Sequence, residues 1–290
     1  MEPWILLALG SAFFQGLRNV AMKRIGHALD QNINVWGRFT FLLPFTGATT
    51  LWFGLPELQP GFWAWCLAFA VSQNLATLSL SRALLHSDIS LVTTLWKVSM
   101  IFLVVWGFLA LGEQPTPIGL VGILLAVAGV YLVNASRTQV VWYAPFLALA
   151  RDRGQVYTLL SAFFYAPSVI TIKQLALLSD AYFATFMGYL TASLLLTPVV
   201  LHTSRTHFRE IPRHWKDFLG LGIFAALSTI FTTKAYTLTL SSYVEAVKQV
   251  EILLALALGV VLFGEKARVR AIWPGSLLML LGLVLLKLYG

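Results

Sequence analysis

The chain has little charge: Asp, Glu, Lys and Arg make up 11% of its 290 residues, where about 25% is usual in soluble proteins. Hydrophobic residues make up 58%, and the mean hydropathy is +0.79. Because so few charges cannot form a wettable surface around a core, this composition excludes a soluble domain. It also excludes disorder and a basic, soluble nucleic-acid-binding domain, despite a net charge of +8. The sequence therefore predicts an integral membrane protein.

The chain also lacks the residues of several catalytic and metal-binding sites. Its single cysteine, Cys66, excludes an intrachain disulfide and a metal site built from cysteines. A glycine-rich nucleotide-binding loop is absent, which argues against ATP-driven transport by this chain alone. The histidines all fall at the ends of apolar segments or in loops: His27, His86, His202, His207 and His214. We therefore expect no enzyme, no metal site and no cofactor.

Ten segments are long and apolar enough to cross a membrane as helices. A spanning helix needs about 20 mostly apolar residues, because the hydrocarbon layer is about 30 Å thick. Barrel strands would instead alternate apolar and polar residues over about ten positions, and the sequence has no such pattern. The expected helices are 4–25, 33–54, 60–84, 90–111, 116–134, 155–178, 181–203, 215–240, 243–263 and 270–289. The start of the chain lacks the basic region of a cleaved signal peptide.

An internal repeat relates the two halves of the chain. The tetrapeptide Ser-Ala-Phe-Phe at 11–14 recurs at 161–164. Basic and acidic residues recur in the same order at offsets of 150 to 152: Lys23 with Lys173, Asp30 with Asp180, Arg82 with Lys234, Lys97 with Lys248, and Glu113 with Glu265. Such matches are hard to obtain by chance in a chain with so few charges. We expect a first five-helix repeat over 1–134, a linker over 135–154, of which 142–150 lies along the membrane interface, and a second repeat over 155–290.

The repeat has a consequence for mechanism. Each half holds five helices, an odd number, so the second half enters the membrane from the opposite side to the first. Many secondary transporters have such inverted repeats and bind their substrate near the midplane between the two halves. When the halves exchange conformations, a cavity open to one side becomes open to the other. The sequence therefore predicts an all-α membrane fold of two inverted five-helix repeats and transport by alternating access.

These features resemble the ten-helix, EamA-type carriers of the drug/metabolite transporter superfamily. The resemblance rests on the repeat, on the Ser-Ala-Phe-Phe and basic residue of the first and sixth segments, and on the Gly-Glu that ends the fourth and ninth. It implies a central cavity enclosed by the first four segments of each repeat, with the fifth and tenth packed outside. Those outer segments carry small residues suited to close helix packing: Gly119, Gly122, Ala126, Gly129, Gly275, Ser276 and Gly282.

The fourth segment departs from the EamA-type pattern, which often has a proline near its middle. Lys97 stands there, and Lys248 occupies the equivalent position of the ninth segment. In the related triose-phosphate and nucleotide-sugar translocator branch, basic residues on these two helices hold the substrate phosphate. The resemblance therefore implies that both lysines face the substrate. A lysine suits a carrier, because its compact and mobile charge can release the ligand.

Charged residues inside the expected helices should face a cavity or a partner, since a charge at mid-membrane costs about 2.5–3.5 kcal/mol. Cations outnumber anions there: Arg18, Arg38, Arg82, Lys97, Lys173, Lys234 and Lys248 stand against Glu245 and Glu251. A substrate carboxylate or phosphate would satisfy the excess. Alternatives stay open for residues near segment ends, such as Arg82 and Lys173, whose side chains could reach lipid headgroups. The arginines of the first two segments are either substrate ligands or structural groups bonded to nearby amides.

The two glutamates of the ninth segment have their own alternatives. Glu251 lies one helical turn from Lys248 and either neutralises it or acts as a switch that releases the lysine to the substrate. Glu245 could do the same from the other side. Uncharged candidates for the substrate-binding cavity are Gln73, Asn74, Tyr165, Trp96 and Tyr243. Aromatic residues are common in this chain, so some serve packing or interfacial belts instead.

Basic residues near the loops give the orientation. Twelve Lys and Arg residues flank the loops that follow odd-numbered segments, and only Lys287 flanks the other side. The positive-inside rule then places the odd loops in the cytoplasm and both termini outside the cytoplasm. The resemblance implies the reverse, and we give the charge bias more weight. We expect a multi-pass protein of the bacterial inner (plasma) membrane.

Three functions follow as hypotheses. The first is a secondary transporter of a small organic anion, phosphorylated or carboxylated, that works as an exchanger or an ion-coupled carrier. The second is an exporter of amino acids or neutral metabolites, and the third is a lipid-headgroup flippase. The expected partners are a small-molecule substrate and the lipid bilayer, without nucleic acid. The sequence leaves a homodimer open.

Overall fold

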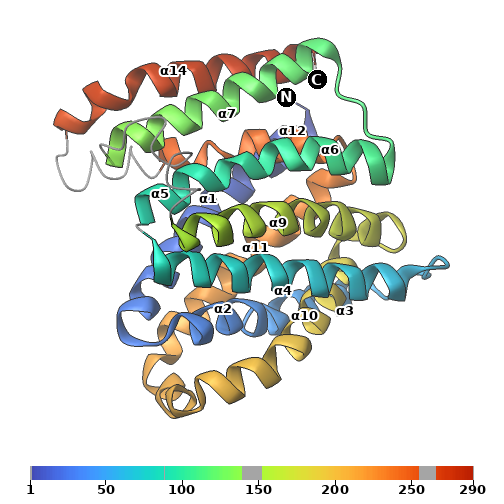
Figure 1. Ribbon diagram of the computed structural model, residues 1–290. Helices are drawn as coiled ribbons and strands as arrows, with labels where there is room; N and C mark the ends of the chain where they lie inside the picture. The colour runs from blue at the N-terminus through green and yellow to red at the C-terminus, as the bar shows by residue number, and fades with distance from the viewer. Residues whose placement is uncertain (1, 88, 139–151, 255–265, 290) are drawn as a thin grey trace.

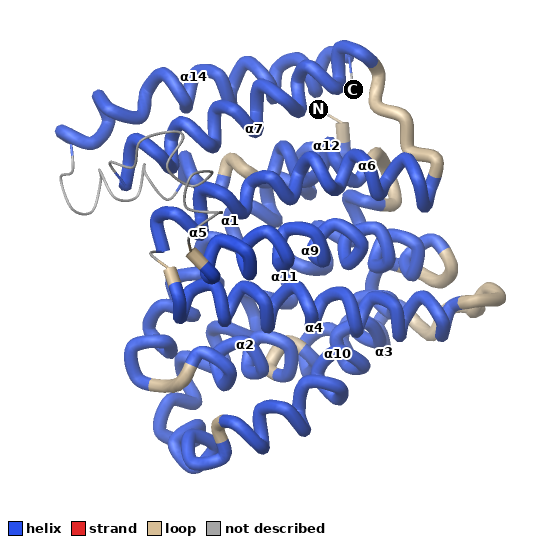
Figure 2. Tube along the Cα trace, in the orientation of Figure 1, coloured by secondary structure: helices blue, strands red, loops and turns tan. Residues whose placement is uncertain are grey.

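The structure is a computed structural model that describes residues 2–87, 89–138, 152–254 and 266–289. In these ranges all regular structure is helical, and the helices form one bundle (Figures 1 and 2). The helices are α1 (Pro3–Ala28), α2 (Gln31–Thr40), α3 (Leu43–Phe53), α4 (Phe62–His86), α5 (Ile89–Leu95), η1 (Trp96–Val98), α6 (Ser99–Leu111), α7 (Pro117–Thr138), α9 (Arg153–Leu177), α10 (Ala181–Thr203), η2 (Arg205–His214), α11 (Trp215–Tyr236), α12 (Ser241–Lys248) and α14 (Lys266–Tyr289).

Consecutive helices join into the ten expected segments, which confirms the all-α prediction for the described part of the chain. The second segment consists of α2 and α3, the fourth of α5, η1 and α6, and the ninth begins with α12. By length and composition, five helical stretches in the described ranges could cross a membrane: Pro3–Gly26, Leu91–Leu111, Arg153–Leu177, Ala181–Thr203 and Arg205–Tyr236. The expected interfacial part of the linker, 142–150, and the end of the ninth segment lie outside the described residues.

The second segment is not the continuous helix that we expected over 33–54. Helix α2 ends at Thr40, and α3 begins at Leu43 with Pro44 in its first turn. Proline has no N–H to donate to the carbonyl group four residues earlier, and its ring clashes with that carbonyl group. The local chemistry of Pro44 therefore explains the break.

Two further breaks coincide with the repeat-related lysines. Lys97 lies in η1, a single 3₁₀ turn between α5 and α6. Helix α12 ends at Lys248, where Gln249 N donates to Ala246 O at 3.2 Å and Val250 N donates to Val247 O at 3.1 Å. These are the short-range bonds of a 3₁₀ turn, which often marks a functional site within a helix. Both halves of the molecule thus interrupt a helix at the same position of the repeat.

Helix packing follows the symmetry of the repeat. Helix α4, the third segment, packs on α9, the sixth, while α1, the first, packs on α11, the eighth. Exchanging the two repeats turns one pair into the other. Helices α7 and α14 pack on each other along one edge of the bundle (Figure 1). Their approach is close, because a Cβ atom on Gly129 would lie 2.5 Å from the carbonyl oxygen of Gly275.

Candidate substrate-binding cavity

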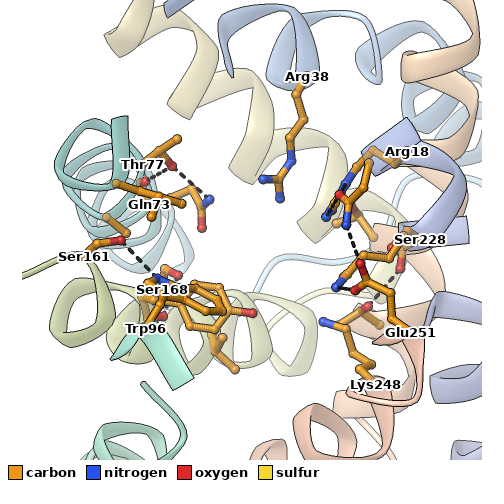
Figure 3. A pocket seen from close by; sticks show the side chains of 18 of the residues that line it. Arg18, Arg38, Gln73, Thr77, Trp96, Ser161, Ser168, Ser228, Lys248 and Glu251 are labelled. Carbon is orange, nitrogen blue, oxygen red and sulfur yellow. Dashed lines mark hydrogen bonds between the residues drawn. The ribbon is translucent and has the colours of Figure 1, made fainter. Parts of the chain in front are cut away.

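A cavity of about 440 Å³ lies between the two repeats. Its lining comes from the first four segments of the first repeat and from the sixth to ninth segments of the chain, as the resemblance implied. Described residues of α7 and α14 do not contribute to it. Figure 3 shows polar and charged side chains that point into this cavity from several helices.

The cavity reaches one end of the bundle. Its lining includes Met22 near the end of α1, Leu84 near the end of α4 and Val92 near the start of α5. These positions adjoin the loops that follow odd-numbered segments. The opposite end carries the ends of α6 and α9 and the start of α12, which are joined by buried polar contacts.

Those contacts centre on an ion pair between Lys173 of α9 and Glu113, which follows α6. Lys173 Nζ lies 2.6 Å from Glu113 Oε1, and both side chains are buried. Lys173 also donates to the carbonyl group of Thr239 at 2.7 Å, and Ser241 Oγ donates to Glu113 at 2.9 Å. Glu113 belongs to the first repeat and its partners to the second, so this cluster ties the repeats together. We call it the end latch. The idea that the Lys173 side chain extends to lipid headgroups is therefore wrong.

The repeat-related lysines meet in the cavity. Lys97 Nζ donates to the side-chain oxygen of Gln249 at 2.8 Å, and Gln249 is the neighbour of Lys248. Both lysines line the cavity. Lys97 is attracted by the carboxylates of Glu245 and Glu251 and repelled by Lys248. The helix breaks therefore bring one lysine from each half into a single electrostatic cluster.

Glu245, rather than Glu251, is the carboxylate in contact with Lys248. Lys248 Nζ lies 2.5 Å from Glu245 Oε1, and both side chains are buried. Tyr165 OH donates to the other oxygen of Glu245 at 3.0 Å, and Tyr236 OH donates to Oε1. One turn of α12 separates Glu245 from Lys248, which is the usual spacing for such a pair.

Glu251 instead contacts α1. It accepts hydrogen bonds from the side-chain amides of Gln15 and Asn19. Arg18 donates to the side-chain oxygen of Asn19 at 3.0 Å, so Asn19 bridges Arg18 and Glu251. Arg18 is therefore bonded to a neighbouring amide, one of the two alternatives that the sequence left open, and it also lines the cavity.

Arg38 enters the cavity from α2. Figure 3 shows its guanidinium group pointing between a wall with Gln73 and Thr77 and a wall with Arg18 and Glu251. It makes no hydrogen bond or ion pair with the residues that the structure describes. Its guanidinium carbon lies 5.6 Å from the centroid of the Phe39 ring. Arg38 and Arg18 lie close enough for their positive charges to repel each other.

Aromatic side chains form a further part of the lining. The rings of Trp96 and Tyr165 lie 4.8 Å apart, and Trp96 Nε1 donates to Ser161 Oγ at 3.1 Å. Lys97 Nζ lies 5.6 Å from the centre of the Trp96 ring. Trp96 and Tyr165 thus line the cavity, which is where the sequence analysis expected them.

Two predicted cavity residues lie elsewhere, which corrects their assignment. Asn74 is buried and donates to the carbonyl group of Ala192 at 3.0 Å, because it lies about 100° around α4 from Gln73. Tyr243 is buried against α7, where its hydroxyl accepts a hydrogen bond from Thr116 N at 3.0 Å. Both residues connect helices and do not line the cavity.

The sequence reasoning missed several polar lining residues. Thr77 lies one turn after Gln73 on α4, so the spacing of polar residues could have found it. Tyr189 also lines the cavity, but the spacing of polar residues does not single it out. Other missed residues are small and hydroxylated, a type common throughout membrane helices: Thr93, Ser161, Ser228, Thr229, Thr232 and Thr233.

The other cations of the apolar segments lie outside the cavity. Arg82 is exposed, with its guanidinium carbon 5.8 Å from the centre of the Tyr157 ring. Lys234 is exposed and donates to the hydroxyl of Tyr182 at 3.1 Å. Across the described residues, His, Cys, Asp and Glu form no group of three that could hold a metal ion.

A bundle of two interlocked helical repeats around a polar cavity is the architecture of a membrane carrier. A family model for the EamA-like transporter family matches residues 2–135 and 152–288, and the chain belongs to this family. It is thus a membrane protein of a family that transports small molecules. A solved structure described only as "Crystal structure of protein" is 14% identical, with a TM-score of 0.79 over 98% of this chain and 96% of that chain, which supports the fold alone. No curated protein matches the sequence.

Proposed function

We propose that the protein is a secondary transporter, without enzymatic activity, that moves a small phosphorylated or carboxylated anion by alternating access. One observation carries this proposal: Lys97 and Lys248, from opposite repeats, meet in one polar cavity. An anion bound there contacts both repeats, so a movement of one repeat against the other changes its access to the two sides. The position of the cavity at one end and of the end latch at the other supports this mechanism.

Glu245 and Glu251 are the proposed coupling groups. In the structure Glu245 neutralises Lys248. A substrate anion that attracts Lys248 leaves Glu245 without its cation, and the carboxylate then gains from taking up a proton. In an ion-coupled carrier this exchange of partners links substrate binding to proton uptake, whereas in an exchanger the next anion replaces the first.

A second candidate function is export of amino acids. Glu251 is bonded to the neutral side chains of Gln15 and Asn19, and it lines the cavity. Its carboxylate could bind the ammonium group of a zwitterion while Arg38 binds the carboxylate. In this case transport would depend on Glu251 as strongly as on the cations.

The orientation and location are also part of the proposal. The charge bias places the cavity-open end of the bundle in the cytoplasm and both termini outside it. The expected location is the bacterial inner membrane.

Counterflow in vesicles tests the carrier proposal. Vesicles that contain the full-length protein are loaded with one phosphorylated, dicarboxylic or amino acid compound, and uptake of its radiolabelled form is measured. We expect counterflow for an anion and its loss, by about tenfold or more, in Lys97→Ala and Lys248→Ala, because each removes about 1.4 kcal/mol or more of binding.

Lys216→Ala is the matched control, since Lys216 is exposed beside Trp215 and does not line the cavity. Its counterflow should equal that of the parent protein. Counterflow of a neutral amino acid that survives in both lysine variants would contradict anion transport and favour the second candidate.

A further inference from the structure

The formal charges around the cavity do not balance. The described residues that line it, or that bond to its lining, carry four cations and two carboxylates: Arg18, Arg38, Lys97, Lys248, Glu245 and Glu251. Their sum is four minus two, or +2. The pair of Glu245 and Lys248 adds zero to this sum even if a proton passes between them. The excess therefore belongs to the two arginines and Lys97.

Two of these three cations donate hydrogen bonds to neutral side-chain amides and not to carboxylates. Lys97 donates to the amide oxygen of Gln249. Arg18 reaches Glu251 only through the amide of Asn19. Arg38 has neither a hydrogen bond nor an ion pair within the described ranges, although its guanidinium group points into the cavity (Figure 3).

The arginines have no counterparts in the second repeat. At an offset of 150, Arg18 corresponds to Ser168 and Arg38 to Gly188. A Cβ atom on Gly188 would lie 2.9 Å from the ring of Phe69, so a long side chain does not fit there. Both arginines therefore come from the first repeat of an otherwise symmetric frame, as expected for a site that binds a charged group at one end of a molecule.

We propose that the transported anion is a dianion, such as a phosphate monoester or a dicarboxylate, and that Arg38 and Arg18 bind its charge. This inference rests on the proposed anion transport and narrows its substrate. A dianion brings the formal sum to zero, whereas a monoanion leaves one buried positive charge without compensation. The planar guanidinium group matches two oxygens of a carboxylate or phosphate, and a cavity of about 440 Å³ holds a small metabolite.

Two ligand series test the charge requirement; the first keeps the size of the ligand nearly constant, and in the second only the two phosphate esters are similar in size. Succinate, succinamate and succinamide carry two, one and no negative charges, and so do glycerol 3-phosphate, its methyl ester and glycerol at about pH 8. Calorimetric titration of the full-length protein in detergent measures each affinity. In at least one series the dianion should bind at least about tenfold more tightly than the monoanion, a difference of about 1.4 kcal/mol.

Variants test the role of Arg38. Arg38→Gln should weaken dianion binding about 30-fold or more, the effect of removing one partner of a buried charge pair, and weaken monoanion binding less. Adding Glu251→Gln restores the sum to +2 and should recover part of the preference for the dianion. Lys234→Gln removes the same charge outside the cavity and should change neither affinity.

Equal binding of monoanion and dianion in both series would overturn the dianion proposal and leave anion transport standing. Binding of only the neutral compounds, or of none of the six, would overturn both proposals. Equal losses in Lys234→Gln and Arg38→Gln would also overturn the inference, because the cavity would then play no special part. The series with the parent protein decides the charge requirement even if a variant does not fold.

Discussion

Glu245 shows how single residues set the electrostatics of this cavity. Its side chain is buried and accepts contacts from Lys248, Tyr165 and Tyr236, which belong to three different helices. A carboxylate survives inside the membrane only with such partners, because burial of an unpaired charge is costly. Glu245 is therefore both a structural centre of the second repeat and the proposed coupling group.

Replacing Glu245 by Leu should lower the free energy of unfolding by about 3–5 kcal/mol, because Lys248 is left as a buried charge without a partner. Chemical denaturation of the purified protein in detergent measures this loss. The double variant Glu245→Leu/Lys248→Met removes both charges and should recover most of the stability. Glu57→Leu changes an exposed carboxylate and should cost no more than about 0.5 kcal/mol. If the single and double variants lost the same free energy of unfolding, the ion pair between Glu245 and Lys248 would be contradicted as the cause.

Neighbouring residues on one helix have different roles here. Gln73 lines the cavity, and Asn74 bonds to α10, although the two are adjacent polar residues. Composition and spacing predict that such residues avoid lipid, but they do not give the rotation of the helix. Only the packing of α4 between α9 and α10 decides which of the two faces the cavity.

At the scale of helices, the irregular positions carry the chemistry. The turn at 96–98 and the turn after Lys248 bring both lysines into the cavity, and the segment directly after α6 supplies Glu113 to the end latch. The sequence predicted the spanning segments, because about 20 apolar residues suffice for that. It did not predict the breaks at the lysines, because they depend on contacts between helices.

The end latch should close its end of the bundle. Ile172 lines the cavity next to Lys173, so a cysteine at position 172 in a Cys66→Ala background reports access from that end. Glu113→Gln leaves Lys173 without its carboxylate and should favour opening there. Labelling of Ile172→Cys by an impermeant maleimide from the latch end should become at least about tenfold faster, equivalent to about 1.4 kcal/mol. Glu57→Gln, an exposed change, should have no effect, and equal rates in all variants would assign the pair to stability alone.

At the scale of the whole molecule, the interlocked pairs α1 with α11 and α4 with α9 hold the repeats together across the cavity. The excess of basic residues on one side is a property of the entire chain and is the basis of the proposed orientation. The open end of the cavity coincides with that basic side. Orientation therefore decides whether the structure corresponds to an inward-open or an outward-open carrier.

The proposed orientation predicts which cysteines an impermeant maleimide reaches in intact cells. In the Cys66→Ala background, Glu57→Cys lies in the exposed loop between α3 and α4 and should be labelled. Thr206→Cys lies in η2 on the basic side and should be labelled only after the membrane is permeabilised. The reverse pattern would place both termini in the cytoplasm and contradict the charge argument.

The sequence alone determined that the chain enters a membrane, how many segments it has and that its halves repeat, because each follows from composition, length and the order of rare charges. It also indicated that Lys97 and Lys248 belong together. The tertiary structure decided that Lys248 pairs with Glu245, that Tyr243 packs against α7 and that Arg38 has no hydrogen bond or ion pair with any residue that the structure describes. These outcomes depend on the rotation of each helix, its breaks and its neighbours, which arise only when the helices pack.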